Sequence, residues 1–398
     1  MAKQSKTTVV PRLRFPEFRE AMAWEVTPMG RLMNLEYGES LPEHCRRPDS
    51  IPVMGSNGIV GYHDEALVKG PAIVVGRKGS VGEVNWVDKE CFPIDTTYYV
   101  ENRQPSSTLM QFLYRLLQLA KLDQRRDPGA VPGLSRNVVH SLQTAIPGRP
   151  EQQKIADCLR SLDEVIAAQG RKVAALKTYK QGLMQQLFPR EGETVPRLRF
   201  PEFRDGPAWR ETRLNSLGEL VSGLTYSPND VRDSGLLVLR SSNVQNGEIA
   251  IDDNVYVTPS IKGANLARPN DILICVRNGS KALIGKSALI PEGMPPCTHG
   301  AFMTVFRASA PHFAFHLLQL ASFQKQVAVD LGATINSING SQLLKYRFIV
   351  PEKDEQKRVA ELLSCLSSWI GAEFKKLATL KAHKKGLMQQ LFPQPEEV

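Results

Sequence analysis

Polar side chains that we expect to be exposed stand beside glycines at several points where strands are expected to end, and these side chains could bind DNA. Arginine and asparagine can reach the edges of guanine and adenine with two hydrogen bonds in the major groove of DNA. Taken singly, such a residue is more often an ordinary solvated loop residue. Recurrence in both halves of the chain improves the case for DNA contact only modestly. The candidates are Ser56, Asn57, Arg77, Lys78, Arg240, Ser242, Asn243, Arg277 and Asn278.

No set of residues indicates catalysis. Segment Gly279–Ser287 resembles a phosphate-binding loop, but five residues instead of four separate its glycines, and Pro291 breaks any following helix. The chain has no glycine-rich adenosylmethionine loop, no Asn/Asp-Pro-Pro-aromatic motif and no carboxylate set of a metal-dependent nuclease. The 7 histidines show no paired spacing for zinc, and lone Asp95 and His299 are interpreted as turn or core partners. We therefore expect no catalytic residue, cofactor or metal in this chain.

Two helical segments must hold the rest of the chain in place. Apolar residues follow each other at alternating steps of four and three, which is the seam of a coiled coil, although an ordinary bundle core is the alternative. The row appears twice with every position shifted by 204, and both copies end on nearly the same residues, at 180–189 and 384–393. Gln169, Lys180, Glu373 and Lys384 interrupt the rows and would set the register. The sequence predicts two long antiparallel helices, with the seam Ile155, Leu159, Leu162, Ile166, Val359, Leu363, Leu366 and Ile370.

A second repeat precedes each of two divergent segments. The words VPRLRFPEFR stand at 10–19 and again at 195–204, followed by Trp24 and Trp209. Their prolines forbid a helix interior and predict an extended strap that docks through its apolar side chains. We divide the chain into a strap (1–24), a first variable domain (25–146), a central helix (147–190), a linker with the second strap (191–209), a second variable domain (210–350) and a C-terminal helix (351–393).

Both variable domains are expected to mix short strands with one helix. The first has strand-like runs at 53–54, 55–61, 72–75 and 97–100, and a helix at 107–122 that Ser106 or Ser107 would cap. The second has strand-like runs at 236–239, 249–251, 271–276 and 302–306, and a helix at 312–331. The fold class is thus mixed α/β (α+β), with two pseudo-repeated domains joined by the two helices.

Length, composition and charge limit the remaining possibilities for domain number, location and partners. A chain of 398 residues can bury at least two cores. No apolar run reaches the length of a membrane span, no signal peptide is visible, and the 6 cysteines form no CxxC pair, so a cytoplasmic protein is expected. The net charge of +9 permits nucleic-acid binding without proving it, because 27–146 holds 13 basic and 13 acidic residues.

In combination, the sequence motifs of this chain resemble those of the specificity subunit of type I restriction–modification systems. The resemblance rests on LRFPEF with its tryptophan, PVMGSNGIVGYHDE at 52–65, GPAIVVGRKGSVG at 70–82, VLRSSNVQNGEI at 238–249 and the GLMQQLFP helix ends. Together these words span almost the whole chain. The resemblance implies two target-recognition domains that each read one half of a bipartite DNA site, with the helices setting the spacing.

The resemblance also implies partners. The subunit would recruit two modification subunits that methylate adenine with S-adenosylmethionine, and restriction subunits that use ATP and magnesium to translocate and cut. The chain itself would be non-catalytic. Two alternatives stay open: a coiled-coil scaffold whose inserts bind protein, and the specificity subunit of a related system that only methylates.

Overall fold

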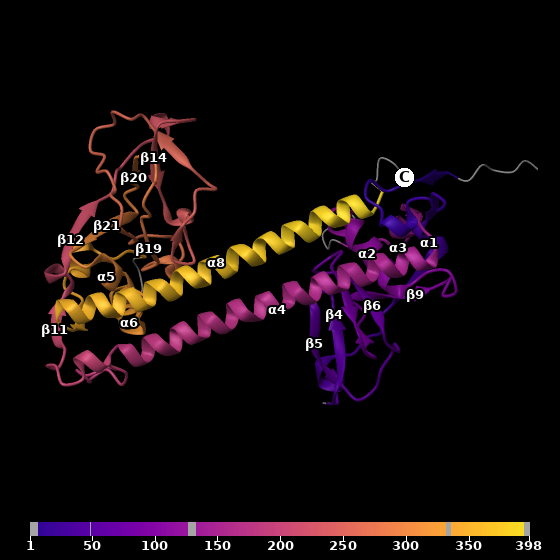
Figure 1. Cartoon of the computed structure of the whole chain (residues 1–398), viewed down its shortest axis with the longest axis horizontal. Coiled ribbons are helices and arrows are strands. Elements are labelled where there is room, and N and C mark those ends of the chain that lie inside the picture. Colours follow the sequence, from indigo (N-terminus) through magenta and orange to yellow (C-terminus); the bar gives the residue numbers. More distant parts are fainter. Residues whose placement is uncertain (1–6, 48, 126–132, 332–335, 394–398) are drawn as a thin grey trace, which may run out of the picture. The chain divides into compact units, whose positions relative to one another are not determined.

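The computed structural model describes residues 7–47, 49–125, 133–331 and 336–393. The chain folds as two compact units. Unit 1 comprises residues 1–170 together with 375–398, and unit 2 comprises residues 171–374. Each unit therefore contains one variable domain and a part of both long helices (Figure 1).

The described residues of unit 1 form three small sheets and three short α-helices. Strands β1 (Thr8–Val9), β2 (Trp24–Pro28) and β10 (Gln143–Ile146) form an antiparallel sheet in the order β1-β2-β10. A four-stranded antiparallel sheet has the order β3-β9-β6-β7, from Met33–Tyr37, Thr97–Asn102, Ala72–Gly76 and Val84–Val87. The third sheet has the order β5-β4-β8, from Gly58–His63, Ile51–Gly55 and Phe92–Pro93. The helices are α1 (Met29–Leu32), α2 (Met110–Leu119) and α3 (Arg136–Ser141).

Unit 2 repeats the four-stranded antiparallel sheet. Its order is β12-β21-β18-β19, from Gly218–Ser222, Met303–Ala308, Ile272–Cys275 and Ser287–Leu289. A second sheet has the order β13-β17-β14-β20, from Val231–Arg232, Val255–Val257, Leu236–Leu239 and Cys297–His299. Two pairs complete the strands: β11 (Arg210–Arg213) with β22 (Arg347–Val350), and β15 (Val244–Gln245) with β16 (Glu248–Ile249). The helices are α5 (Pro311–Leu317), α6 (Ala321–Asp330) and α7 (Gly340–Leu343).

The two long helices, α4 (Arg149–Leu187) and α8 (Lys353–Leu391), each run without a break for 39 residues. In unit 1, Ile155 and Leu159 near the start of α4 share a buried cluster with Leu391 at the end of α8. In unit 2, Leu187 at the end of α4 shares a cluster with Leu363 near the start of α8. The helices are therefore antiparallel, as the sequence predicts. That they pair as a coiled coil along their whole seam remains a prediction, since Leu162 and Ile166 are only half-buried.

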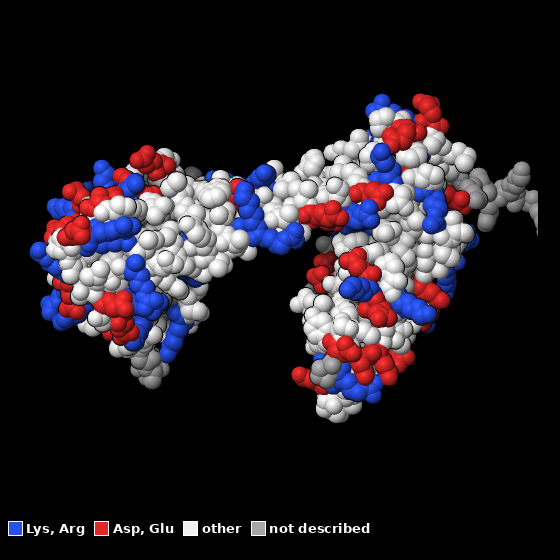
Figure 2. All heavy atoms as spheres, turned by 60° about the horizontal axis from the view of Figure 1, so that its bottom comes forward, with Lys and Arg blue, Asp and Glu red and all other residues white. Residues whose placement is uncertain are grey.

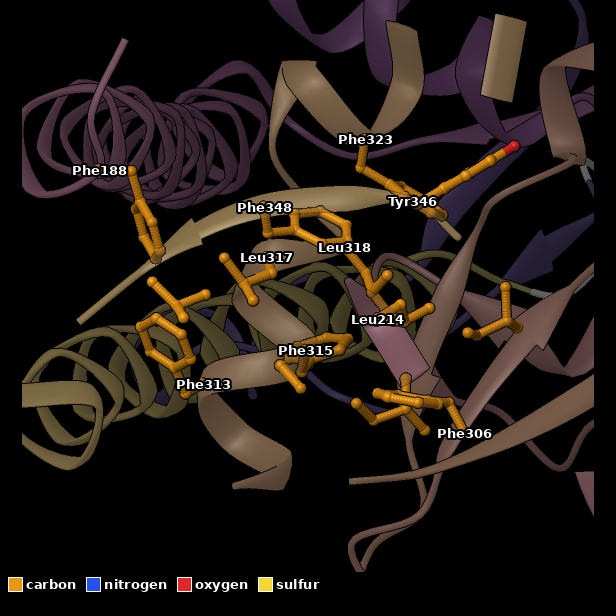
Figure 3. Packing of buried hydrophobic residues seen from close by; sticks show 14 of the residues in the cluster. Phe188, Leu214, Phe306, Phe313, Phe315, Leu317, Leu318, Phe323, Tyr346 and Phe348 are labelled. Atoms are coloured by element: carbon orange, nitrogen blue, oxygen red, sulfur yellow. The ribbon is translucent and has the colours of Figure 1, made fainter. Parts of the chain in front are cut away.

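The aromatic core of each unit ties a domain to the helix ends. In unit 1 the rings of Trp24 and Phe392 meet edge to face, 6.0 Å between centroids. In unit 2 the rings of Trp209 and Phe188 do the same at 5.9 Å, and Phe188 lies 5.8 Å from Phe313 (Figure 3). The repeated tryptophan and the repeated LFP helix end thus fill equivalent places in the two cores.

The polar residues of the seam contact the domains as well as the opposite helix. Lys384 of α8 lies 2.5 Å from the Asp163 carboxylate of α4, and buried Arg115 of α2 pairs with the same carboxylate at 2.7 Å. In unit 2, Lys180 instead lies beside the Gln319 amide at 3.4 Å, and burial lowers the pKa of its ammonium group. The heptad pattern of the seam does not reveal the contact of Lys180 with the domain.

Both straps dock in the same way across the two helices. The Arg14 guanidinium donates two hydrogen bonds of 2.7 Å to Glu151 at the start of α4. Arg199 donates two of 2.8 Å to Glu355 at the start of α8. The amide of Leu13 donates to the carbonyl of Gln390, and that of Leu198 to the carbonyl of Gln186, at the end of the other helix. Each strap therefore joins the start of one long helix to the end of the other.

Several predicted elements are confirmed and others differ. The strands predicted at 72–75, 97–100 and 236–239 are present, whereas 249–251 is paired only at Glu248–Ile249. The predicted helix at 107–122 starts later, at Met110, and neither Ser106 nor Ser107 caps it. The reason is that Gln152 of α4 accepts the Leu109 amide and donates to the Ser107 carbonyl, which holds this segment as a turn.

The helix predicted at 312–331 is two helices. The break falls at Leu318–Leu320, and Leu320 is extended. It redirects the chain so that Phe323 of α6 packs against Tyr346 and Phe348. Within the described part of the chain, no helix is long and apolar enough to cross a membrane.

Candidate nucleic-acid interface

In unit 1, the backbone of one turn is fixed around a single carbonyl. The amides of Arg77 and Lys78, which follow β6, and the hydroxyl of Ser56 all donate to the carbonyl of Thr96. The sharp course of the turn needs glycine, because a Cβ on Gly76 would lie 2.1 Å from the Ser80 carbonyl oxygen. The structure therefore brings three of the predicted residues together, and it leaves the Arg77 and Lys78 side chains outside this hydrogen-bond network.

The Arg77 side chain stacks on an aromatic pair. Its guanidinium carbon lies 4.9 Å from the ring centroid of Tyr37 and 5.9 Å from that of Tyr98. Arg136, at the start of α3, lies 5.2 Å from the same Tyr37 ring. We call Arg77, Arg136 and Tyr37 the arginine fork. No carboxylate among the described residues forms an ion pair with either arginine.

Tyr37, on which the fork arginines lie, belongs to a cross-strand pair of tyrosines. Tyr37 and Tyr98 are direct cross-strand partners of β3 and β9, and their centroids are 5.1 Å apart. Tyr98 is buried and its hydroxyl donates to the Leu134 carbonyl, and burial raises the pKa of this phenol to about 12. Tyr37 is 47% exposed. The fork thus lies on a half-exposed ring whose cross-strand neighbour is buried and hydrogen-bonded.

Two of the candidates expected to be exposed are buried. Ser56 is only 8% exposed and Asn243 only 1%. Asn243 accepts the Arg240 amide and donates to the Ala250 carbonyl, so its amide group holds a turn. The prediction that these two side chains are exposed is wrong, because Ser56 donates to the Thr96 carbonyl of another segment and Asn243 holds its own turn.

The remaining candidates of unit 2 meet in one region. The Asn278 amide donates to the Ser241 hydroxyl at 3.0 Å, which joins the loop after β18 to the turn after β14. Arg240 is ion-paired with Asp253 at 2.7 Å, whereas Ser242 is exposed. Arg277 stacks on Phe302, 5.3 Å from the ring centroid, and Phe302 is 57% exposed. Asn57 of unit 1 is also exposed, in the turn between β4 and β5.

The backbone shows which positions of the two domains correspond. The Thr96 carbonyl accepts the amides of residues 77 and 78, and the Phe302 carbonyl accepts those of residues 276 and 277. The carbonyl of residue 77 accepts the Leu134 amide, and that of residue 276 accepts the Ile338 amide. Val276 therefore stands at the position of Arg77, and Arg277 at that of Lys78. Arg136 lies two residues beyond Leu134, where unit 2 has Gly340 two residues beyond Ile338.

The sequence signal found Arg77 but missed its partners. Arg136 and Tyr37 lie far from it in the chain, and no local pattern marks either residue. His299, interpreted as a core partner, is fully buried with Nε2 at 2.9 Å from the Val221 carbonyl oxygen, and burial lowers the pKa of its imidazole. No group of side chains that could hold a metal ion occurs among the described residues.

Charge does not concentrate on the visible surface. Figure 2 shows basic and acidic side chains interspersed on the face presented by each unit.

A family model and individual relatives both match this chain, and they indicate the same family. The family model for the type I restriction modification DNA specificity domain matches residues 23–178 and 208–382. The specificity subunits of the type I restriction enzymes StySPI of Salmonella potsdam and EcoKI of Escherichia coli K12 are 29% and 30% identical to the chain over 168 residues. Each of these matches covers 40% of the chain and 36% of the relative.

The fold has been seen before. The S subunit of a type I restriction-modification system from M. genitalium superposes with a TM-score of 0.67 at 16% identity, covering 97% of this chain and 100% of that one. Two domains and two long antiparallel helices, as in that S subunit, define the class of fold. The chain belongs to the family of type I restriction modification DNA specificity domains.

Proposed function

We propose that this chain is the DNA specificity subunit of a type I restriction–modification complex. The observation that carries the proposal is one repeated frame around two different surfaces. The straps, the sheet order and the helix ends repeat in both units, whereas the arginine fork of unit 1 is replaced by Val276 and Gly340 in unit 2. Each domain then reads one half of a bipartite site, and the continuous helices set the spacing between the halves.

The chemistry of DNA recognition explains why the frame repeats while the two surfaces differ. Contacts to phosphate place a protein on DNA, and contacts to base edges supply sequence information. A frame that must hold two readers in register has to keep its contacts, and a reader that recognises a different half-site has to change them. S-adenosylmethionine, ATP and magnesium would belong to partner subunits, so the role proposed for this chain is recognition and assembly.

The straps support binding of two copies of one modification subunit. The buried pairs Arg14–Glu151 and Arg199–Glu355 explain why the arginines of both straps are kept. They do not explain the repeated apolar residues that face outward: Val10 and Leu13 are 57% and 38% exposed, and Val195 and Leu198 are 49% and 40% exposed. Two matching exposed surfaces in one chain fit two copies of the same partner.

Placing a charge on these surfaces tests that assignment. We expect Leu13→Asp to remove one modification subunit from the purified complex, Leu198→Asp to remove one, and the double variant to remove both, because a carboxylate must be desolvated in an apolar contact. Native mass spectrometry counts the copies. Met22→Asp is the matched control, since Met22 is 90% exposed in the same strap but lies outside the repeated residues 10–19 and has Pro207 at the equivalent position. Full occupancy in the double variant would disprove the assignment.

Unit 2 offers a test of base reading. Arg277→Ala should weaken specific DNA binding of the assembled complex by about 1–3 kcal/mol and relax one position of one half-site, if the guanidinium contacts a base. Arg240→Ala should have a smaller effect, because Asp253 already binds its guanidinium. Competition binding with specific and random duplexes measures both. An equal loss on both duplexes would assign Arg277 to a phosphate.

The function as a whole is tested in cells. Sequencing of methylated adenines across the genome, with the gene present and deleted, should show one bipartite motif that disappears with the gene. If every methylated motif survives deletion, the chain is not the specificity subunit of an active methyltransferase.

A further inference from the structure

The geometry of the arginine fork points to the base that unit 1 recognises in its half of the DNA site. Resting on the proposed function, we propose that Arg77 and Arg136 read the O6 and N7 edge of guanine in the half-site recognised by unit 1. Tyr37 acts as the positioning residue that holds both guanidinium groups.

Stacking on an aromatic ring fixes the orientation of a guanidinium group, which is variable in a free arginine side chain. A guanidinium group against an aromatic face keeps its plane, and its N–H groups remain available at the edge. Both fork arginines stack on one ring at 4.9 and 5.2 Å, and the ring belongs to a cross-strand pair whose second member, Tyr98, is anchored to Leu134. A planar donor group held in advance suits a planar pair of acceptors, and guanine offers that pair in the major groove.

Among the described residues the fork arginines form no ion pair, in contrast to Arg240 and Arg115, and Arg277 on Phe302 forms none either. Arg240 has its carboxylate partner in Asp253, and Arg115 has one in Asp163. For the fork arginines the described residues offer aromatic faces and no ion pair. Their N–H groups suit a ligand that accepts hydrogen bonds in the plane of the guanidinium.

Comparison of the two units favours a base over a phosphate. A phosphate contact is useful whatever the sequence, so it would be kept in both domains, as the strap contacts are. The fork is not kept: Val276 and Gly340 occupy the two equivalent backbone positions. Change at equivalent positions is what two readers of different half-sites require. Exposed Lys78, next to the fork, has a flexible cationic side chain better suited to the backbone of DNA.

The test uses the full chain assembled with its modification subunits. Methylation of a randomised bipartite library is sequenced for the unaltered chain and for Arg77→Ala, Arg136→Ala, Arg77→Lys and Arg136→Lys. We expect a guanine in one half-site of the unaltered protein. Each alanine variant should lose roughly 5- to 150-fold discrimination at one guanine of that half, with the other half unchanged. The lysine variants should not restore this discrimination, because an ammonium group lacks the planar set of N–H donors of a guanidinium group.

Two further variants separate positioning from folding. Tyr37→Phe keeps the ring and should keep the motif, whereas Tyr37→Ala should relax the same guanine positions while the complex still assembles. Arg31→Ala removes an exposed arginine of unit 1 outside the fork and should change nothing.

Three results would overturn the guanine assignment. They are a unit 1 half-site without guanine, rescue by lysine, and a uniform loss of methylation on all sequences, which would indicate phosphate contact. In each of them a chain-dependent bipartite motif would still support the proposed function. Absence of any such motif in the unaltered complex would instead remove the function itself.

Discussion

Replacing residues 25–146 by the matching segment of a relative is expected to change one half of the methylated motif completely and to leave the other half unchanged. The segment includes both fork arginines and their tyrosine platform, and the frame that carries it is repeated in the chain. Because base-edge contacts supply sequence information, a new set of contacts reads new bases. Sequencing of methylated adenines in cells that carry the chimaera gives the motif directly.

The exchange has its own control. The same replacement at residues 210–350 should change the other half of the motif and preserve the first. The buried contacts between domain and helices must be kept in the chimaera, in particular the Arg115–Asp163 pair of unit 1. A chimaera that alters both halves at once, or neither, would contradict the modular reading by two domains.

Lengthening both long helices is expected to widen the gap between the two half-sites. Four residues inserted after Gln169, with four matched residues after Glu373, add roughly 6 Å to each helix. The base pairs of duplex DNA rise by about 3.4 Å each, so the spacer should grow by one or two base pairs. Both half-site sequences should stay the same, because the reading loops are not altered.

The insertion points leave the ion pairs of each unit intact. Asp163 and Lys384 both stay in unit 1, and Lys172 and Glu373, which form an ion pair, both stay in unit 2. Four residues are slightly more than one helical turn, so most of the seam can re-form with a local distortion. Insertion in α4 alone is the control, and it should prevent assembly because the opposite helix is then too short. A doubly lengthened chain that assembles and still methylates the original spacing would refute the role of the helices in setting the gap.

The sequence by itself determined the frame. Heptad steps in two copies predicted two long helices, and identical words at 10–19 and 195–204 predicted two equivalent straps. These signals are readable because helical periodicity is local and because identical residues make identical contacts, as Arg14 and Arg199 show with their glutamates. The family resemblance had the same origin, since its words lie in the repeated frame and at the strand ends.

Tertiary structure alone decided which of the polar candidates come together. Arg77 was visible beside a glycine, but Arg136 and Tyr37 reach it only because β3, β9 and the segment before α3 meet at the end of β6. Ser56 and Asn243 have the same sequence signal as Arg77, yet they point inward, Ser56 to the Thr96 carbonyl and Asn243 to the backbone of its own turn. A sequence shows which groups can donate hydrogen bonds, whereas only the fold shows which donors are already bound within the protein and which remain available to DNA.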